Sequence, residues 1–188
     1  RQINNPNGTI AILVKARSHL VEILPLLRAN HLPYRAIEID ELNTRPVIRD
    51  LCALTKALLH PADRVAWLSI LRAPWCGLTL ADLLVIAETS QNSTILYTIQ
   101  QSTTIALLSQ EGQVRLTFLK EIIIRALKER QRHPLPEWVR QAWLALNAPA
   151  SLSHEGDLRD ASHYFDLLSQ IEHGGDIKDF DLLEEKIK

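Results

Sequence analysis

The sequence has 188 residues, with 21 Lys and Arg, 22 Asp and Glu, two Cys and six Gly. An apolar fraction of 46% is enough to bury a core and excludes a wholly disordered chain. Two cysteines are too few for a disulfide framework or a Cys-only metal site, and they suit a reducing compartment. Because no apolar run approaches the roughly 18 residues that span a bilayer, we expect a soluble cytoplasmic protein with no membrane partner.

The scarcity of glycine limits the chemistry of the chain. The six glycines are scattered, so neither a GxxxxGK[ST] loop nor a GxGxxG loop can be built to hold phosphates. We therefore expect no nucleotide hydrolysis by these residues alone. The absence of compact ligand or nucleophile patterns further predicts no catalytic residue, cofactor or metal site among them. The sequence contains no Met, even at position 1, and we expect it to be a segment of a longer chain.

The first forty residues follow a strand, helix, strand pattern. Residues 10–14 form a short apolar run rich in β-branched side chains, typical of a strand buried on both faces. Ser18 can cap a helix whose apolar positions in residues 20–27 recur with a period of 3.6, with Pro25 inside it. Residues 34–39 alternate like a second strand. The pattern predicts a βαβ unit with two parallel strands.

Two parallel strands cannot form a self-sufficient sheet. We therefore interpret residues 1–42 as part of a larger α/β lobe whose other strands lie outside this sequence. Residues 43–188 contain no further strand pattern and predict a mainly α-helical insertion. Periodicity, Pro46 and a capping Asp63 predict helices at about 46–58, 64–72, 78–90, 95–108, 113–132, 136–143, 156–173 and 179–186.

A polar cluster directly follows the first predicted strand. It consists of Lys15, Arg17, Ser18 and His19. The carboxyl ends of parallel strands and the N-termini of the helices that follow them favour anionic ligands. Lys15 and Arg17 could each neutralise a phosphate of a nucleic-acid backbone, and Ser18 could position one. The alternative is an ordinary solvated surface.

Other side chains leave two interpretations open. Residues 113–154 carry seven basic against three acidic side chains, and residues 155–188 carry four against ten. This asymmetry fits either solvated helix faces or a side that faces a polyanion, with Arg125, Lys128, Arg132 and Arg140 as its cations. Trp138 and Trp143 could pack in the core, or one of them could stack on a base.

Two sets of sequence tracts carry a family resemblance. The first set is IAILVKARSH (10–19), LPYR (32–35), RPVIRDL (45–51) and LRAPWCGL (71–78), and the second is HPAD (60–63) and LPEWVR (135–140). In this order and at this spacing, the first set resembles the UvrD/Rep/PcrA family of superfamily 1 DNA helicases. The second set, together with APWCG (73–77), is most similar to the helicase–nuclease branch of that family, the exonuclease V beta subunit or RecB/AddA type.

The resemblance implies a division of the chain and a set of DNA contacts. Residues 1–42 would begin the second RecA-like lobe, and residues 43–188 would form the helical 2B subdomain inserted into it. Lys15, Arg17, Ser18 and His19 would contact the single strand. Gly77 and Thr79 would lie at the turn whose backbone approaches duplex phosphates, although here Thr79 replaces a second glycine and Cys76 replaces an arginine.

The resemblance also implies an activity for the parent protein. The parent would hydrolyse ATP with magnesium to unwind or degrade DNA in repair or recombination, through motifs outside this sequence. The partners would be DNA, the remaining helicase lobes and other subunits of a helicase–nuclease complex. The alternative is a non-enzymatic helical module that binds a protein partner through its acidic residues 155–188.

Overall fold

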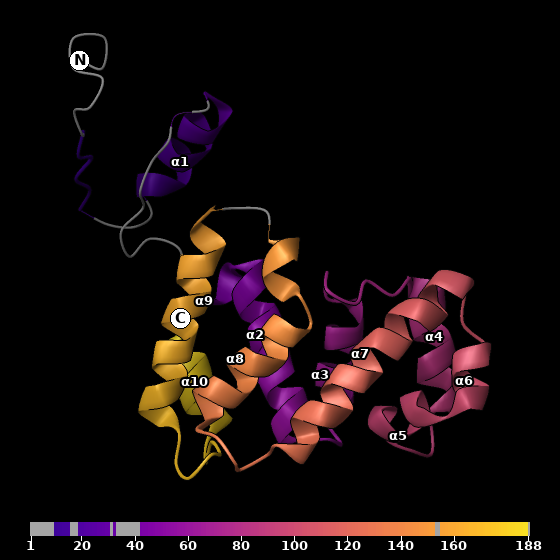
Figure 1. Cartoon of the computed structure of the whole chain (residues 1–188). Coiled ribbons are helices and arrows are strands. Elements are labelled where there is room, and N and C mark those ends of the chain that lie inside the picture. Colours follow the sequence, from indigo (N-terminus) through magenta and orange to yellow (C-terminus); the bar gives the residue numbers. More distant parts are fainter. Residues whose placement is uncertain (1–9, 16–18, 31, 33–41, 153–154, 188) are drawn as a thin grey trace. The chain divides into compact units, whose positions relative to one another are not determined.

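The computed structural model describes residues 10–15, 19–30, 32, 42–152 and 155–187, and the chain divides into two units, Arg1–Asp40 and Glu41–Lys188. Throughout the described residues the regular secondary structure is helical, which confirms a mainly α fold (Figure 1). In the first unit, α1 (Leu20–Ala29) forms where the apolar period predicts it and contains Pro25.

The predicted βαβ unit is not supported by the structure. Residues 10–14 form no strand, and residues 34–39 lie outside the described part of the chain. Within residues 10–14 the side chains are largely in water, and Leu13 is 94% exposed. A β-branched apolar run becomes a strand only where a neighbouring strand pairs its backbone and a covering layer buries its side chains. The described residues supply neither for this segment.

The second unit is a bundle of helices, and the helices predicted from residue 46 onward form with small shifts at their ends. The predicted helix over residues 95–108 is two short helices, because the backbone at Gln101 is extended. In chain order the helices are η2 (Leu42–Thr44), α2 (Pro46–Leu59), α3 (Arg64–Arg72), α4 (Leu80–Thr89), α5 (Ile95–Gln100), α6 (Ser102–Ala106), α7 (Gln110–Lys128), α8 (Leu135–Ala145), η3 (Ala148–Ser151), α9 (Glu155–Ile171) and α10 (Phe180–Lys186).

Helix α2 is the central helix of this unit. It packs against α3, α7, α8 and α9, and Figure 1 shows it behind α8 and α9. Ile48, Leu51, Leu54 and Leu58 are completely buried, which removes their apolar surface from water. Pro46 begins the helix, where its missing N–H would have no intrahelical partner.

Polar groups in the core are paired across helices. The hydroxyl groups of Thr55 on α2 and Tyr164 on α9 lie 2.8 Å apart and share a buried hydrogen bond. The indole Nε1 of Trp138 donates to the carbonyl of Ala126 at 2.7 Å, which joins α8 to α7. Since Trp138 and Trp143 are only 2% and 3% exposed, both pack in the core and neither can stack on a base.

Asp50 on α2 provides a test of how burial affects stability. It is half-buried, and the described residues give it no hydrogen-bond donor. Burial raises the pKa of this carboxyl from 3.8 to about 6, against the opposing effect of the Arg49 charge. A carboxyl whose pKa is raised by folding favours the folded state below its unfolded pKa, and this contribution is lost as the pH rises through the folded pKa.

Raising the pKa from 3.8 to about 6 is worth about 3 kcal/mol at about 1.4 kcal/mol per pKa unit, and screening of this partly exposed carboxyl by water reduces that value. We therefore expect Asp50→Asn to stabilise the fold at pH 8 by about 1–2 kcal/mol. At pH 3 the substitution should have little effect, because both side chains are then neutral. Urea unfolding of the two proteins at both pH values measures this, with Asp166→Asn, an exposed carboxyl on α9, as the control. Equal stability of Asp50→Asn and wild type at pH 8 would contradict the account.

Candidate nucleic-acid interface

The basic cluster predicted near the start of the chain is described only in part. Lys15 and His19 are both exposed, and His19 lies directly before α1. Arg17 and Ser18 lie outside the described residues. The exposed ammonium group of Lys15 and imidazole of His19 are accessible to a phosphate in solution, and the described geometry brings no further cation to them.

Gly77 forms a tight turn between α3 and α4. Its φ is +62°, a conformation that glycine adopts readily. The Gly77 amide donates to the carbonyl of Ala73 at 2.7 Å, and the Leu78 amide donates to the carbonyl of Leu71 at 3.0 Å. The Gly77 carbonyl accepts a hydrogen bond from the guanidinium of Arg115 on α7, and a Cβ at Gly77 would lie 2.8 Å from that nitrogen. The turn is therefore held from both sides.

Thr79 is the N-cap of α4. Its Oγ1 accepts from the Asp82 amide at 3.1 Å and donates to the Asp82 carboxylate at 2.8 Å. The amides of Leu80 and Ala81, in the first turn of α4, have no hydrogen-bond partner among the described residues, and both residues are exposed. Free amides at a helix N-terminus favour an anion. Gly77 and Thr79 therefore lie at the start of α4, and their contact with duplex phosphates stays a prediction.

The carboxylate of Asp82 joins this end of α4 to the start of α7. It accepts hydrogen bonds from the amide and the hydroxyl of Ser109, at 2.7 and 2.9 Å. Ser109 is the N-cap of α7, and its Oγ accepts from the Gly112 amide at 3.0 Å. A Cβ at Gly112 would lie 2.7 Å from the carboxylate, so the close approach requires glycine. One negative charge thus lies at the positive ends of two helices.

Burial and hydrogen bonding act on Asp82 in opposite directions. Desolvation raises the pKa of the carboxyl, while hydrogen bonds from Ser109 and Thr79 lower it, and the net pKa lies below the ordinary value of 3.8. Asp82 therefore stays charged and faces α7. A phosphate at this turn would meet the outer amides of α4, since the inner position already holds a carboxylate. Cys76 adds no charge beside the turn, because burial raises the pKa of its thiol to about 12.

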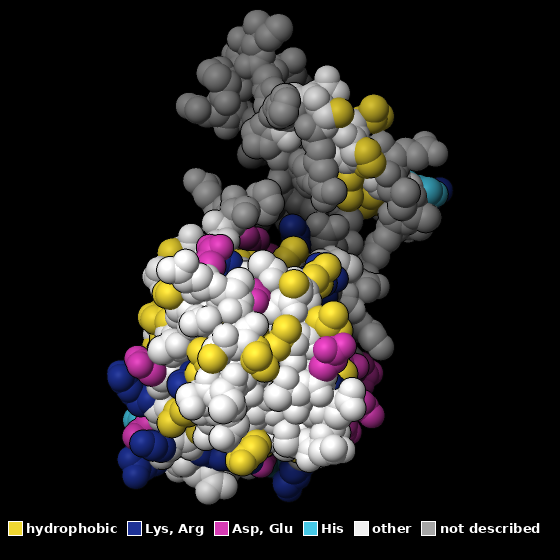
Figure 2. Space-filling model, turned by 90° about the vertical axis from the view of Figure 1, so that its right-hand side faces the viewer, with side chains coloured by type: hydrophobic (Ala, Val, Ile, Leu, Met, Phe, Trp, Pro, Cys, Tyr) yellow, Lys and Arg dark blue, Asp and Glu magenta, His cyan; other side chains and the backbone are white. Residues whose placement is uncertain are grey.

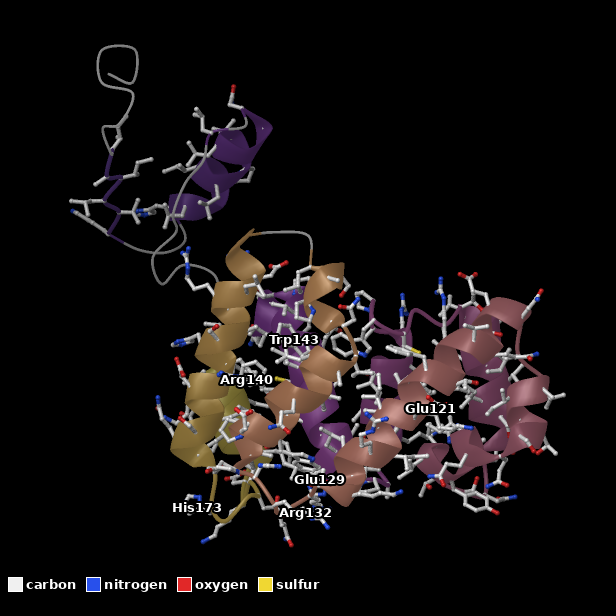
Figure 3. The ribbon with its side chains drawn as sticks, in the orientation of Figure 1. Glu121, Glu129, Arg132, Arg140, Trp143 and His173 are labelled. Atoms are coloured by element: carbon white, nitrogen blue, oxygen red, sulfur yellow. The ribbon has the colours of Figure 1, made fainter. Side chains whose placement is uncertain are left out.

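Two of the four predicted cations, Arg132 and Arg140, make contacts close to their own positions. Arg132 lies just after α7, where its guanidinium pairs with Glu129 at 3.0 Å. Arg140 lies on α8 with its guanidinium 4.8 Å from the ring centre of Phe165. Figure 3 shows Arg132 and Arg140 well separated along the bundle, with Arg140 close to Trp143 on α8. Arg132 and Arg140 are therefore engaged locally, whereas Arg125 and Lys128 are exposed on α7.

Most acidic side chains of residues 155–188 are also engaged within the chain. Asp157 is buried, and the exposed carboxylates that make no side-chain contact among the described residues are those of Asp166, Asp181 and Glu185. This leaves few free charges for an acidic docking surface. The contacts are Arg45 with Asp160 at 3.7 Å, Lys56 with Glu184 at 2.6 Å, Arg130 with Asp176 at 3.4 Å and the Leu135 amide with Glu172 at 2.5 Å.

Comparisons with known proteins add no family to this description. No protein-family model matches the chain, and no curated protein matches it. Among the described residues, no group of three His, Cys, Asp or Glu side chains could hold a metal ion. None of the described helices has both the length and the apolar character needed to cross a membrane.

Sequence reasoning identified Gly77 and Thr79 and missed Asp82, Ser109 and Arg115. The signal for Asp82 is present, because a threonine followed three residues later by an acidic residue is the pattern of a capping box. Ser109 and Arg115 have no such signal. They reach the turn from α7, 27 and 38 residues away along the chain.

We expect Asp82→Asn to destabilise the fold at pH 7 by about 2–4 kcal/mol, because hydrogen bonds to a charged acceptor are strong and a buried donor loses its partner. A carboxyl whose pKa is lowered by folding contributes stability above its unfolded pKa, and this is lost as the pH falls through the folded pKa. The difference between variant and wild type should therefore shrink below about pH 4. Urea unfolding at several pH values measures it, and a difference independent of pH would contradict the proposed charge.

We expect Gly77→Ala to lower the free energy of unfolding more than Gly174→Ala does. Gly174→Ala is the matched control. Both glycines have a left-handed φ, at +62° and +66°, but a Cβ at Gly174 would meet no atom within 4 Å. Each change carries a conformational cost of about 1 kcal/mol, and Gly77→Ala also displaces Arg115. In thermal unfolding of an Arg115→Ala protein, Gly77→Ala should destabilise the fold no more than Gly174→Ala does. If the effects of Gly77→Ala and Arg115→Ala on stability simply add, the contact between these two residues is contradicted.

Proposed function

We propose that this chain is a segment of a superfamily 1 DNA helicase of the exonuclease V beta type and contributes DNA-backbone contacts without catalysis of its own. Residues 1–42 belong to the second RecA-like lobe of the parent, and residues 43–188 form its 2B-like subdomain. Two findings support the proposal. The helicase-like tracts occur in one order along the chain, and the second unit is a helical bundle.

The observation that carries the proposal is the turn at Gly77. A left-handed glycine leads into α4, and the exposed amides of Leu80 and Ala81 have no partner among the described residues. The resemblance places a duplex contact at this position. Backbone amides bind phosphate without reading base sequence, which suits a protein that moves along DNA. Thr79 keeps its own hydroxyl engaged with Asp82, so the contact uses amides rather than this side chain.

The single-stranded part of the DNA binds at the cluster of Lys15, Arg17, Ser18 and His19. Each lysine or arginine that neutralises a phosphate releases a condensed counterion, so binding falls as salt rises. The parent protein supplies the ATP and magnesium sites from residues outside this sequence. In that protein the second unit steers the duplex or regulates the motor, next to the remaining lobes and any further subunits of a helicase–nuclease complex.

Salt dependence of DNA binding tests the proposal. Fluorescence anisotropy measures the affinity of the chain for a duplex with a single-stranded tail at several NaCl concentrations. The Lys15→Ala, Arg17→Ala double variant should flatten the slope of log K against log[NaCl] by about 1.4, since each single-strand contact contributes about 0.7.

The matched control is Arg159→Ala with Lys178→Ala, which removes two exposed charges elsewhere and should leave the slope unchanged. Equal flattening in the two double variants would point to general electrostatic attraction and would remove Lys15 and Arg17 from the interface. Binding by the wild-type chain that does not depend on salt would contradict the proposal as a whole.

A further inference from the structure

Helix α7 crosses the front of the second unit in Figure 1 and buries one of its faces. On its outer face Val114 and Phe118, one turn apart, are 69% and 46% exposed. Figure 2 views the molecule from the side of α4 and α6, where hydrophobic side chains are scattered among charged ones. Apolar exposure alone is therefore common on this surface. What distinguishes α7 is the order of the charges around Phe118.

Two opposite charges lie in line with Phe118, at equal distances on either side of it. Glu111 lies seven positions before Phe118 and Arg125 seven positions after it, and both are exposed. Residues seven positions apart are two turns apart and nearly in line along a helix. The exposed line therefore reads acid, aromatic ring, base. Read in the opposite direction it is base, aromatic ring, acid, so the line is complementary to an antiparallel copy of itself.

Both charged groups are accessible to a partner. The guanidinium of Arg125 makes no ion pair and no side-chain hydrogen bond with any residue that the structure describes. The side chain of Glu111 is 68% exposed, and its carboxylate pairs with Arg115 through Oε1, which leaves Oε2 for a second donor. Arg115 and Glu121 lie three positions from Phe118 on opposite flanks of the line, where an interface has its polar rim.

We propose that the outer face of α7 binds the same face of a second copy of this chain, with the two helices antiparallel about a two-fold axis at Phe118. The axis brings the two Phe118 rings together and places Glu111 of each copy opposite Arg125 of the other. Helices that cross at about 20° keep residues spaced by seven in contact. A parallel pair would place acid against acid. With two acids and two bases on this face, Glu121 and Arg115 included, a polyanion such as DNA finds no net positive charge there.

Sedimentation equilibrium of the full chain tests the centre of this interface. We expect a monomer–dimer equilibrium with a Kd of about 10–100 µM, because one helix from each copy forms a small contact. Phe118→Lys should raise the Kd at least about tenfold, since it places two ammonium groups against each other at the axis. The control is Leu158→Lys on α9, where the side chain is 53% exposed and lies outside the line. It should leave the Kd unchanged.

Mixing two charge variants tests the symmetry. Arg125→Glu alone and Glu111→Lys alone each create two like-charge contacts per dimer, so each should raise the Kd at least about tenfold. An equimolar mixture of the two variants restores an acid–base pair at both ends of the line, and the mixed dimer should have a Kd within about threefold of wild type. The contact of Glu111 with Arg115 inside one chain is not restored by mixing, so it cannot account for this recovery.

A wild-type chain that remains monomeric up to about 500 µM would overturn the proposal. It would also be overturned by a dimer that Phe118→Lys does not weaken, or by two charge variants that associate no better with each other than with themselves. Circular dichroism of every variant checks that the fold is intact. No DNA is present in these measurements, so their outcome is independent of the proposed helicase function.

Discussion

The arrangement of α4 and α7 depends on the hydrogen bonds that the buried carboxylate of Asp82 accepts. A buried carboxylate is costly unless hydrogen bonds replace the lost water, and here Ser109 and Thr79 supply them. Because the donors belong to the caps of two helices, satisfying this one charge also sets how the helices meet. The turn at Gly77 leads into α4, and the N-cap of that helix, Thr79, donates to the same carboxylate.

Elements whose causes are local could be predicted from the sequence. Helix α3 spans residues 64–72 as predicted, because Asp63 caps its first turn and its apolar residues follow the helical period. Pro46 likewise marks the start of α2. The prediction of a strand at residues 10–14 was wrong, because strand formation depends on partners that are distant in the sequence. Its apolar composition suits a strand only when other strands and a covering layer are present, and these lie beyond any local pattern.

In the candidate interface, too, the residues with a local signal could be predicted and those placed by distant contacts could not. Gly77 and Thr79 were named because the family that the sequence resembles has a glycine turn at this place, and the turn and the helix start are visible over a few positions. Their supporting partners could not be identified, since Ser109 and Arg115 reach the turn from α7 through contacts that no spacing rule encodes. Trp138 and Trp143 show the same limit. From the sequence, these tryptophans could either pack in the core or stack on a base. The structure buries both of them in the core.

One ion pair among the described residues joins the basic residues 113–154 to the acidic residues 155–188. Arg130 pairs with Asp176 at 3.4 Å, while Glu172 accepts a hydrogen bond from the Leu135 amide. Charges that pair in this way add little to the external potential. The proposed DNA contact would therefore depend on exposed cations such as Lys15 and on the free backbone amides at the start of α4. Such contacts bind phosphates without reading the base sequence.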